Sequence, residues 1–473
     1  MEEAKIYFGS TPADKEEWEE HRSPFNDKVV AKYPKCDAQD AIKALQIAQK
    51  AFQKYKNIIP LSQRVAWLRD VAAKLKEQKE EFALTITKEV GKPITFSRVE
   101  VQRAIETIEL SADFAVSLSG ETINTDATQS GRRTMSYYKR VPLGVVVAIT
   151  PFNFPLNLSV HKLAPALVAG NSVVYKPTPE APLTGYKLAK LFIESEYAVP
   201  DMLSLVYGDA EVGNALVTSE IPRKISFTGS VPVGKIIMKN AGIKKVSLEL
   251  GGNAATFIDK DADINQAASR CAVGAFVNSG QVCISLQRIY VHEAIYEEFA
   301  QALANDTKKL KVGDPYEPDT FMGPLINEEA AMRAERWVQS AIKAGARAML
   351  EGKREGKYFY PAILADVTDD MEIVCEEVFA PIVSLVKVQS YEEAIGKMND
   401  SPYGLQFSIF TRDIELIKRF IDDAEAGGVV INDIPTLRFD IQPYGGVKYS
   451  GIGREGPKFA LEEYTELKSV VIV

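Results

Sequence analysis

The segments LELGGN at 248–253 and GQVCIS at 280–285 contain the residues best suited to covalent chemistry. Cys283 is a candidate nucleophile, but a cysteine nucleophile usually borrows a histidine as its base. The chain has only three histidines. The one nearest in sequence, His292, lies at the far end of an apolar, strand-like run. Cys283 is therefore either a packed structural thiol or a nucleophile whose chemistry uses a carboxylate.

Glu249 is the candidate carboxylate, because it ends the alternating run KVSLEL and enters a Gly-Gly turn. Burial at such a strand end raises the pKa of a carboxyl group towards the range of a general base, whereas the alternative interpretation is a charge on an edge strand. Asn153, held between the prolines of PFNFP, is a candidate oxyanion donor or, alternatively, a residue that caps a turn. Lys162 lies on the helix expected next and by itself would be a surface charge.

Two further segments could bind a nucleotide. GSVPVG at 229–234 lies between an expected strand and an expected helix, where glycine and free N–H groups can hold a phosphate. It fits neither the G-x-G-x-x-G pattern nor the Walker pattern, so a plain strand-to-helix turn is an equal alternative. Lys176 ends the strand-like VVYK, where a lysine can contact ribose hydroxyls or a 2′-phosphate, or can simply face solvent.

The totals limit the possible classes of protein. With 473 residues and 46% apolar content, the chain can build two or three well-buried domains. Its net charge of −8 gives no electrostatic support for binding nucleic acid. We expect no membrane partner, because no apolar run approaches the ~18–20 residues needed to cross a bilayer. The acidic start MEEAKIYFGS and the scattered cysteines favour a cytoplasmic, disulfide-free protein, and no residue cluster predicts a metal site.

The order of apolar segments predicts an α/β fold. Helices are expected at about 38–55, with Asp37 as the N-cap, and at about 94–117. The polar stretch 120–140 has strand-like ends and predicts a projecting β-hairpin. From 144 onwards, short apolar strands alternate with helices, which is typical of βαβ crossovers and a mostly parallel sheet. A second such series runs from about 254 to 435, and the terminal SVVIV needs a partner edge, which another subunit could supply.

Seven motifs occur in the order and at the spacing of one known family: PFNFP, KPTP, FTGS, LELGGN, GQVC, EEVFAP and PYGGVKYSGIGREG. Along essentially the whole chain, the sequence resembles the aldehyde dehydrogenase superfamily. The resemblance implies a Rossmann-like nucleotide-binding domain (1–119 and 141–249), an α/β catalytic domain (250–440) and a small β oligomerisation hairpin. The segments 120–140 and 456–473 correspond to the oligomerisation elements, so a homodimer or homotetramer is expected.

The resemblance also implies the chemistry. Cys283 corresponds to the nucleophile that forms a thiohemiacetal and then a thioester, and Asn153 to the amide that stabilises the oxyanion. Glu249 corresponds to the base that activates water, so no histidine is needed. Lys162 is expected near the oxyanion, and Glu455 corresponds to a second active-site carboxylate that can relay a proton.

The expected coenzyme is NAD or NADP. The resemblance assigns coenzyme contacts to Thr150, Pro151, Phe152, Lys176, Thr178, Gly229, Ser230, Glu249, Leu250, Gly251, Glu377 and Phe379. Many NAD-preferring relatives have a glutamate where this chain has Pro179, three residues after Lys176. Our hypothesis is that NADP is accepted and can be preferred, although the nearby Glu180 argues the other way.

The expected substrate is a small polar aldehyde. NFPLNLSVHK and GQVCISLQR are most similar to the branch that acts on lactaldehyde and on non-phosphorylating glyceraldehyde 3-phosphate. Arg103 and Arg438 are candidates for pairing with an anionic tail, although Arg103 alone would more often be a surface ion pair. Phe154 and Val282 stand where phosphate-selective members often have tyrosine and arginine, so lactaldehyde or glycolaldehyde is favoured over succinic semialdehyde or glyceraldehyde 3-phosphate.

Two rival functions stay open at this point. One is a CoA-acylating aldehyde dehydrogenase, against which the presence of Glu249 argues. The other is a non-catalytic binding protein on the same fold, against which the presence of both Cys283 and Glu249 argues. An α/β-hydrolase is excluded because the chain has no G-x-S-x-G elbow.

Overall fold

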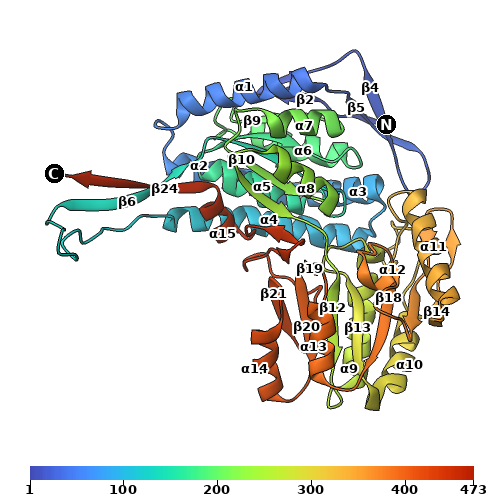
Figure 1. Cartoon of the computed structure of the whole chain (residues 1–473). Helices are drawn as coiled ribbons and strands as arrows, with labels where there is room; N and C mark the ends of the chain where they lie inside the picture. Colours follow the sequence, from blue (N-terminus) through green and yellow to red (C-terminus); the bar gives the residue numbers. More distant parts are fainter.

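The computed structural model describes residues 1–473, which form two lobes, each built around its own sheet (Figure 1). The sheet of the upper lobe contains eight strands, and the five in its middle run parallel. In spatial order they are β23 (Gly451–Ile452), β11 (Lys245–Glu249), β10 (Lys224–Thr228), β7 (Val145–Ile149), β8 (Ser172–Lys176), β9 (Leu203–Leu205), β2 (Ile6–Phe8) and β3 (Thr11–Ala13).

Helices cover both faces of this sheet, as the alternating segments predicted. They are α1 (Ala38–Tyr55), α2 (Leu61–Glu77), α3 (Lys79–Val90), α4 (Ile94–Ser117), α5 (Asn157–Val168), α6 (Pro182–Ile193), α7 (Ala210–Thr218), α8 (Val231–Asn240) and α15 (Pro457–Glu463). The predictions of a helix from about 38 and of another from about 94 are confirmed, and Asp37 forms a capping box with Asp40 at the start of α1. None of the helices is both long enough and apolar enough to cross a membrane.

The lower lobe is built on a seven-stranded, mostly parallel sheet. Its strands, in spatial order, are β14 (Arg347–Glu351), β17 (Ala362–Ala365), β18 (Ile382–Val388), β13 (Leu286–His292), β12 (Ala254–Ile258), β20 (Gln406–Phe410) and β21 (Gly428–Ile431). Its helices are α9 (Ile264–Phe276), α10 (Tyr296–Thr307), α11 (Glu328–Lys343), α12 (Glu372–Cys375), α13 (Tyr391–Asn399) and α14 (Ile414–Asp423), with 3-10 turns η1 (Val277–Gly280) and η2 (Glu293–Ile295).

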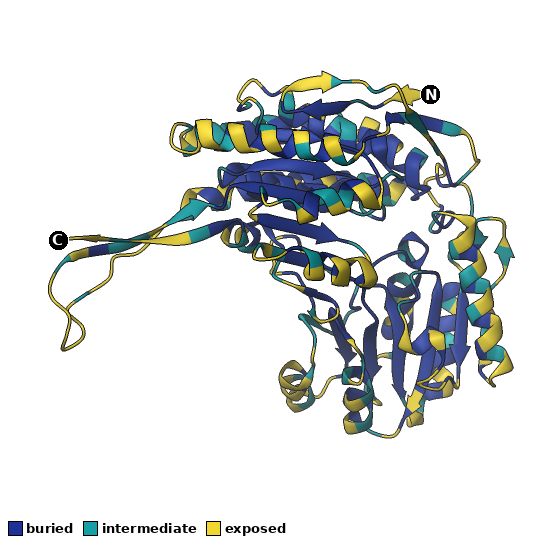
Figure 2. Ribbon diagram, turned by 45° about the horizontal axis from the view of Figure 1, so that its top comes forward, coloured by how far each residue is buried: buried dark blue, intermediate teal, exposed yellow.

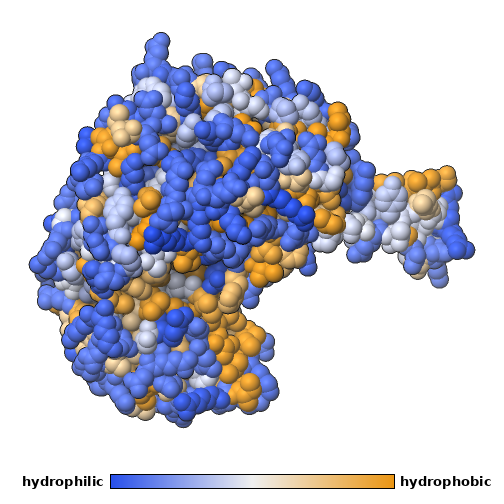
Figure 3. Space-filling model, turned by 180° about the vertical axis from the view of Figure 1, so that it is seen from behind, coloured by the Kyte–Doolittle hydropathy of each residue, from blue (hydrophilic) through white to orange (hydrophobic).

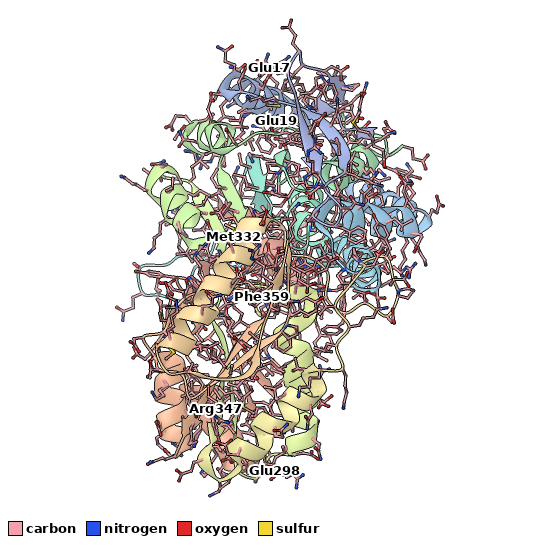
Figure 4. All side chains as sticks on the ribbon, turned by 90° about the vertical axis from the view of Figure 1, so that its right-hand side faces the viewer. Glu17, Glu19, Glu298, Met332, Arg347 and Phe359 are labelled. Atoms are coloured by element: carbon pink, nitrogen blue, oxygen red, sulfur yellow. The ribbon has the colours of Figure 1, made fainter.

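Smaller strand pairs complete the fold. They are the sheet of β1 (Glu2–Glu3), β5 (Val29–Pro34) and β4 (Trp18–Arg22), and the pairs β15 (Arg354–Glu355) with β16 (Tyr358–Phe359) and β19 (Tyr403–Gly404) with β22 (Val447–Lys448). Figure 4 shows the molecule from the side, with Glu17 and Glu19 at the N-terminal sheet and Arg347 and Glu298 at the opposite end of the lower lobe. Met332 marks α11, which crosses that side beside Phe359 of β16.

The cores explain why the strands are apolar along their whole length. In the upper lobe, 70 buried apolar residues form one cluster, which includes the continuous run VVVA of β7. In the lower lobe, clusters of 28 and 22 buried residues lie on the two faces of the sheet. Figure 2 shows the central strands of both sheets as buried, whereas exposed residues lie on the outer faces of the helices, on loops and on the projecting arm. Because both faces of each sheet are covered, alternation of polar and apolar residues is lost.

The site lies where the carboxyl ends of the upper strands meet the lower lobe. The parallel register aligns the ends of neighbouring strands, so that Thr228 lies beside Glu249 and Ile149 beside Lys176. β11 lies between β10 and β23, so the interpretation of Glu249 as a charge on an edge strand is wrong. Residues 250–253, which follow β11, lead directly into β12 of the lower sheet and connect the two lobes.

A two-stranded arm projects from the body (Figures 1 and 3). It consists of β6 (Met135–Pro142) and β24 (Thr465–Ile472), which pair antiparallel along all eight residues of each strand. The expectation that the terminal SVVIV needs a partner edge is confirmed, but β6 of the same chain, and not another subunit, supplies this edge. The predicted hairpin is also only partly right, since residues 120–134 contribute a single bridge, Thr122 to Tyr137, because this stretch is rich in turn-forming residues.

A buried ion pair fixes the start of α5, the helix that follows the PFNFP segment. Lys92 and Glu100 contact each other with both side chains fully buried. The other carboxylate oxygen of Glu100 accepts hydrogen bonds from the N–H groups of Leu156 (2.9 Å) and Asn157 (3.2 Å). The Lys92 ammonium also lies 3.8 Å from the centre of the Phe154 ring. One ion pair thus ties the α3–α4 connection to the segment that carries Asn153.

Breaking this pair is expected to unfold the upper lobe more easily. Lys92→Met leaves the Glu100 charge buried without its cation, and we expect the free energy of unfolding to fall by roughly 3–5 kcal/mol. The double variant Lys92→Met/Glu100→Gln carries no buried charge, so its loss is expected to be smaller than that of Lys92→Met. Urea unfolding followed by circular dichroism measures both.

The control is Arg69→Ala, which breaks an ion pair with Asp113 in which both side chains are 62% exposed. Its expected effect is at most ~1 kcal/mol. A Lys92→Met protein as stable as Arg69→Ala would contradict the structural role of the buried pair.

Candidate active site

A cavity of about 150 Å³ opens beside Cys283, between the two lobes. Its walls come from α4, from the segment after β7, from the segment before β13 and from the segment after β21. The lining residues are Lys92, Phe96, Val99, Glu100, Arg103, Phe154, Asn157, Leu158, Val277, Asn278, Val282, Cys283, Ile284, Thr436, Arg438 and Tyr444. Arg103, Phe154 and Arg438, which the sequence proposed as substrate contacts, therefore share one cavity with the thiol.

The Cys283 thiol has one polar neighbour, because its Sγ lies 3.0 Å from the hydroxyl of Tyr444. Burial raises the pKa of the thiol to about 11, although the Tyr444 bond and the charge of Arg438 act in the opposite direction. The backbone of Cys283 lies against the backbone of Gly252, because a Cβ added at Gly252 would meet the Cys283 carbonyl oxygen at 2.1 Å. Glycine at 252 therefore allows the end of β11 and the nucleophile segment to lie in contact.

The sequence did not identify Tyr444. It stands in PYGGVKYSGIGREG, which was quoted as a motif, but tyrosine at that position gave no chemical signal of its own. Only the fold brings it to Cys283, from 161 residues further along the chain.

Asn153 is buried in the segment after β7, and its side chain is directed at the nucleophile segment. Its Nδ2 donates to the carbonyl of Gln281 at 3.0 Å, and its Oδ1 accepts from the N–H of Phe154 at 3.1 Å. Gln281 precedes Cys283 by two residues. An amide nitrogen carries two N–H groups, so one remains free to donate to a reacting oxygen.

Glu249 is a buried carboxyl group to which no group of the protein donates a hydrogen bond. Only 4% of the residue is exposed, and neither carboxylate oxygen has a partner. Burial raises the pKa of Glu249 well above its ordinary value, and the negative charge of Glu455 raises it further. A Cβ at Gly445 would lie 2.9 Å from Oε1 of Glu249, so the glycine leaves space beside the carboxyl group. Burial and the charge of Glu455 therefore both favour the protonated form of Glu249.

Glu455 is buried to the same degree but is ionised. Its Oε1 accepts a hydrogen bond of 2.8 Å from the ammonium group of Lys162, which is itself 1% exposed. Burial raises the pKa of Glu455, but the charges of Lys162, His161 and Arg438 and the hydrogen bond from Lys162 together outweigh burial, so the pKa is lowered. Lys162 is thus not a surface charge. The sequence named both residues, and the structure pairs them with each other.

A second group of charged side chains, centred on Asp440, lies between the cavity and the Lys162–Glu455 ion pair. Arg103 binds Asp440 with two hydrogen bonds of 2.7 and 2.8 Å, and His161 Nε2 lies 3.0 Å from the same carboxylate. Arg438 approaches Asp440 to 3.6 Å and Glu455 to 3.7 Å, and its guanidinium stacks 3.6 Å from the centre of the Tyr444 ring. Despite burial, the bonds from His161 and Arg103 lower the pKa of Asp440, so the group is ionised.

The two arginines of the cavity therefore share one carboxylate. Arg103 is paired, as the simpler interpretation held, but with the buried carboxylate of Asp440 and not with a solvated surface group. The sequence missed Asp440, although it lies only two residues after Arg438 in TLRFD, and it missed Lys92 as a cavity residue.

The start of α8 has the features of an anion site. Ser230 occupies the N-cap position without making a side-chain cap, and its side chain is exposed. The adjacent Thr228 is buried and its hydroxyl has no hydrogen-bond partner. A buried hydroxyl without a partner beside free helix N–H groups fits a coenzyme pyrophosphate. Gly229 fixes the turn, since its N–H donates to the carbonyl of Glu249 at 3.0 Å. Thr228 was not singled out from the sequence.

Lys176 ends β8 and is 7% exposed. The Thr178 hydroxyl donates to Glu180, which holds this carboxylate close to the segment after β8. Thr150 connects the neighbouring strand end, because its N–H donates to the Lys176 carbonyl at 3.3 Å. Pro151 and Phe152 follow Thr150 and begin the segment that carries Asn153.

The residues expected at the nicotinamide ribose come from the lower lobe. Glu377 accepts a hydrogen bond of 3.0 Å from the N–H of Gly252, and a side chain at Gly251 would collide with its carboxylate. Burial raises the pKa of Glu377 to about 7. Phe379, held at a φ of 48°, packs edge to face against Phe152 with ring centres 6.0 Å apart.

Leu250 completes this side of the cleft. Its side chain lies against Gly234 of α8, where an added Cβ would meet it at 2.6 Å. Some of the residues that the sequence assigned to a dinucleotide therefore lie around the junction of β11, α8 and the Glu377 segment, whereas Thr150, Lys176 and Thr178 lie at the ends of the neighbouring strands β7 and β8.

The sequence model of the Aldehyde dehydrogenase family matches residues 11–470. A 3-sulfolactaldehyde dehydrogenase of Priestia aryabhattai is 42% identical over 462 residues, covering 96% of this chain and 96% of that protein. A lactaldehyde dehydrogenase of Methanocaldococcus jannaschii is 42% identical over 455 residues, covering 95% of this chain and 96% of that protein. The structure of a glyceraldehyde-3-phosphate dehydrogenase of the same archaeon, complexed with NADP, matches with a TM-score of 0.93 and 40% identity over 97% of this chain and 100% of that chain.

The raised pKa of Cys283 predicts how the thiol reacts. Because only the thiolate is nucleophilic and the pKa is about 11, alkylation by iodoacetamide is expected to accelerate about tenfold per pH unit between pH 7 and 9, without a plateau. Tyr444→Phe removes the bond that lowers this pKa, so its rate at a given pH is expected to fall several-fold.

Mass spectrometry of the peptide that contains Cys283 separates this reaction from that of the exposed Cys375, which serves as the internal control. A Cys283 rate that levels off below pH 8 would mean that the thiolate is stabilised, contrary to the geometry described above.

Proposed function

The chain belongs to the aldehyde dehydrogenase family, and from this premise we propose that it oxidises a small polar aldehyde to its carboxylic acid at Cys283, with NAD(P) as the coenzyme. The observation that carries the proposal is the contact between three segments. The Cys283 carbonyl lies against Gly252, three residues after the unpartnered carboxyl group of Glu249, and the Asn153 amide donates to Gln281.

The first covalent step forms a bond between Sγ of Cys283 and the aldehyde carbon. The thiol loses its proton to water, and the carbonyl oxygen becomes the alkoxide of a thiohemiacetal. The remaining N–H of the Asn153 amide and the N–H of Cys283 donate to this oxygen, and each such donor stabilises the transition state by roughly 3–4 kcal/mol. NAD(P)⁺, when bound, would accept the hydride that leaves the carbon, which would leave a thioester on Cys283.

The second step is hydrolysis of the thioester. Glu249, once it has lost its own proton, takes a proton from water, and the resulting hydroxide attacks the thioester carbon. The carbon–sulfur bond breaks, which releases the carboxylic acid and restores Cys283. Glu455 is the charged group whose field raises the pKa of Glu249, so it is suited to pass the proton onward. A carboxylate suffices as the base because it acts on water and not on the thiol.

The favoured substrates are 2-hydroxyaldehydes of two or three carbons, such as glycolaldehyde and lactaldehyde. The cavity of about 150 Å³ accepts only a short chain. The lactaldehyde dehydrogenase that is 42% identical supports the same class.

A second candidate class, short aldehydes with an anionic tail, is favoured by the charge of the cavity. Around the cavity and its base stand four basic side chains, Lys92, Arg103, Arg438 and Lys162, and three ionised carboxylates, Glu100, Asp440 and Glu455. Because the raised pKa of Glu249 favours its neutral form, the basic side chains then outnumber the carboxylates by one. A sulfonate, carboxylate or phosphate tail would neutralise this excess positive charge, and the sulfolactaldehyde and glyceraldehyde-3-phosphate dehydrogenases act on substrates of this kind according to their names.

We also propose that NADP is accepted. Pro179 presents no carboxylate to a 2′-phosphate, and Lys176 offers a positive charge at the end of β8. The NADP complex of the glyceraldehyde-3-phosphate dehydrogenase supports this proposal.

Assembly into a homodimer or homotetramer is proposed from the arm. β24 exposes apolar side chains, with Leu467 at 56% and Val471 at 56%. β21 is a free edge of the lower sheet, bordered by a groove of about 360 Å³. Figure 3 shows hydrophobic surface both on the arm and on the lower lobe beneath it. Two complementary unpaired surfaces of this kind favour association with a second copy.

A panel of aldehydes, monitored by reduction of NAD and of NADP, tests the substrate. We expect lactaldehyde and glycolaldehyde to have kcat/KM at least tenfold above unbranched alkanals of equal length, because the cavity wall is polar. NADP is expected to support turnover within tenfold of NAD or better. A kcat/KM for NAD a hundredfold above that for NADP would contradict the coenzyme proposal. A kcat/KM for long alkanals a hundredfold above that for lactaldehyde would contradict the substrate proposal.

The same panel separates the two substrate classes. If sulfolactaldehyde or succinic semialdehyde gives the highest kcat/KM, the Arg103→Gln variant should lose most of that preference, since it removes one guanidinium at Asp440. Lactaldehyde serves as the matched uncharged substrate, and its kcat/KM should change much less.

Glu249→Gln tests the base. We expect a burst of one reduced coenzyme per active site followed by turnover slowed 10²–10⁴-fold, because the thioester forms but is not hydrolysed. In the unaltered enzyme, kcat is expected to rise with pH as the raised pKa of Glu249 is passed. A variant that still hydrolyses at the normal rate, or a wild-type enzyme that yields an acyl-CoA when CoA is added, would refute the role given to Glu249.

A further inference from the structure

The helix that follows Lys176 is fixed from a distant part of the chain. α6 begins at Pro182, six residues after Lys176, and its first turn packs on the intervening segment. A Cβ at Gly185 would meet the Pro177 ring at 2.7 Å, so the helix and the segment are in direct contact. The position of the first turn of α6 therefore sets the position of residues 176–181.

Glu89, in the last turn of α3, holds that first turn. Its Oε1 accepts a hydrogen bond of 2.6 Å from the N–H of Leu183, and its Oε2 accepts bonds of 2.9 and 2.6 Å from the N–H and the hydroxyl of Thr184. Residues 183 and 184 are the second and third of α6, where backbone N–H groups have no partner within the helix. A carboxylate 94 residues earlier in the sequence thus caps the helix.

No cation contacts the Glu89 carboxylate. The charged and titratable groups that face it are Lys187 on α6, Tyr175 on β8, Tyr207 after β9 and His21 on β4, and His21 bonds only the backbone carbonyl of Glu89. Burial raises the pKa of Glu89 to about 7, against which the bonds from Thr184 and Leu183 act. An apolar residue would fill the space without this cost, so the carboxylate is present for the bonds that it accepts.

We propose that Glu89 is a positioning residue for coenzyme binding: by capping α6 it holds residues 176–181 in the conformation that receives the adenosine end of NAD(P). The inference rests on the proposed assignment of Lys176 and Thr178 to that end of the coenzyme. The carboxylate of Glu89 is fully buried, and its hydrogen bonds go to Leu183 and Thr184 of α6, so it would touch no coenzyme atom.

The segment between α3 and α4 also holds the Asn153 segment of the aldehyde site, through a separate ion pair. Three residues after Glu89, Lys92 pairs with Glu100, which caps α5 after the Asn153 segment. The two caps act on different helices, so loss of the first should affect the coenzyme and leave the aldehyde site in place.

Glu89→Gln tests the proposal. A glutamine can accept through only one oxygen and turns an N–H₂ group towards an N–H donor of α6. At pH 8, where Glu89 is ionised, we expect the KM and Kd for NADP to rise about tenfold or more. The kcat at saturating coenzyme and the KM for the aldehyde should stay within twofold of wild type. Thr184→Val, which removes one of the three bonds, is expected to raise the coenzyme KM two- to fourfold.

Glu81→Gln is the matched control, because Glu81 also lies on α3 and contacts α6, through Lys187 at 2.9 Å, but makes no cap. Its kinetic constants should equal those of wild type. An unchanged coenzyme KM in Glu89→Gln would overturn the proposal. If Glu89→Gln does not fold, an unchanged coenzyme KM in Thr184→Val would overturn it instead. So would a parallel decline of kcat, coenzyme KM and aldehyde KM, which would indicate general damage.

Lys176→Ala tests the assignment of residues 176–181 to the coenzyme separately from the positioning role of Glu89. If Lys176→Ala leaves the coenzyme KM unchanged, the assignment of this segment to the coenzyme fails. If Lys176→Ala raises the KM and Glu89→Gln does not, only the positioning role of Glu89 fails.

Discussion

Two carboxyl groups are buried beside a single ammonium group, and the chemistry of the site depends on how they share it. Lys162 bonds directly to Glu455, which is therefore ionised, and the nearby Glu249 is left without a donor and holds its proton. A second buried negative charge beside Glu455 would be costly, and Glu249 accepts no hydrogen bond that would stabilise its ionised form, so protonation of Glu249 is favoured. The asymmetry assigns Glu249 as the group that can exchange a proton and Glu455 as the group that sets its pKa.

The rest of the fold serves to bring this pair to the thiol. The upper sheet ends its parallel strands at one edge, and residues 250–253 carry the chain from β11 straight into the lower sheet. Glycines at 252 and 445 allow the nucleophile segment and the C-terminal segment to approach Glu249 without side chains between them. The cavity therefore forms where the two lobes meet. The upper lobe supplies residues such as Arg103 and Phe154, and the lower lobe supplies the segment that carries Cys283.

Much of this could be predicted from the sequence, for reasons that particular residues make clear. The helix starting after Asp37 and the strand VVVAI carry local signals, a capping residue and an uninterrupted apolar run, and both formed as expected. Asp440 and Tyr444 carry no local signal: their importance comes from contacts with Arg103 and Cys283, more than 160 residues away in sequence. The partner of the terminal strand, β6, could not be predicted, because an edge strand shows that it needs a neighbour without showing which one.

The central claim is that Glu249 is protonated and Glu455 ionised in the resting protein at neutral pH. Infrared difference spectra between wild type and single variants measure this directly through the carbonyl stretch of a protonated carboxyl group. The account predicts that at pH 7 this band is lost in Glu249→Gln and retained in Glu455→Gln. A band that persists in Glu249→Gln and disappears in Glu455→Gln would place the proton on the other carboxylate and contradict the account.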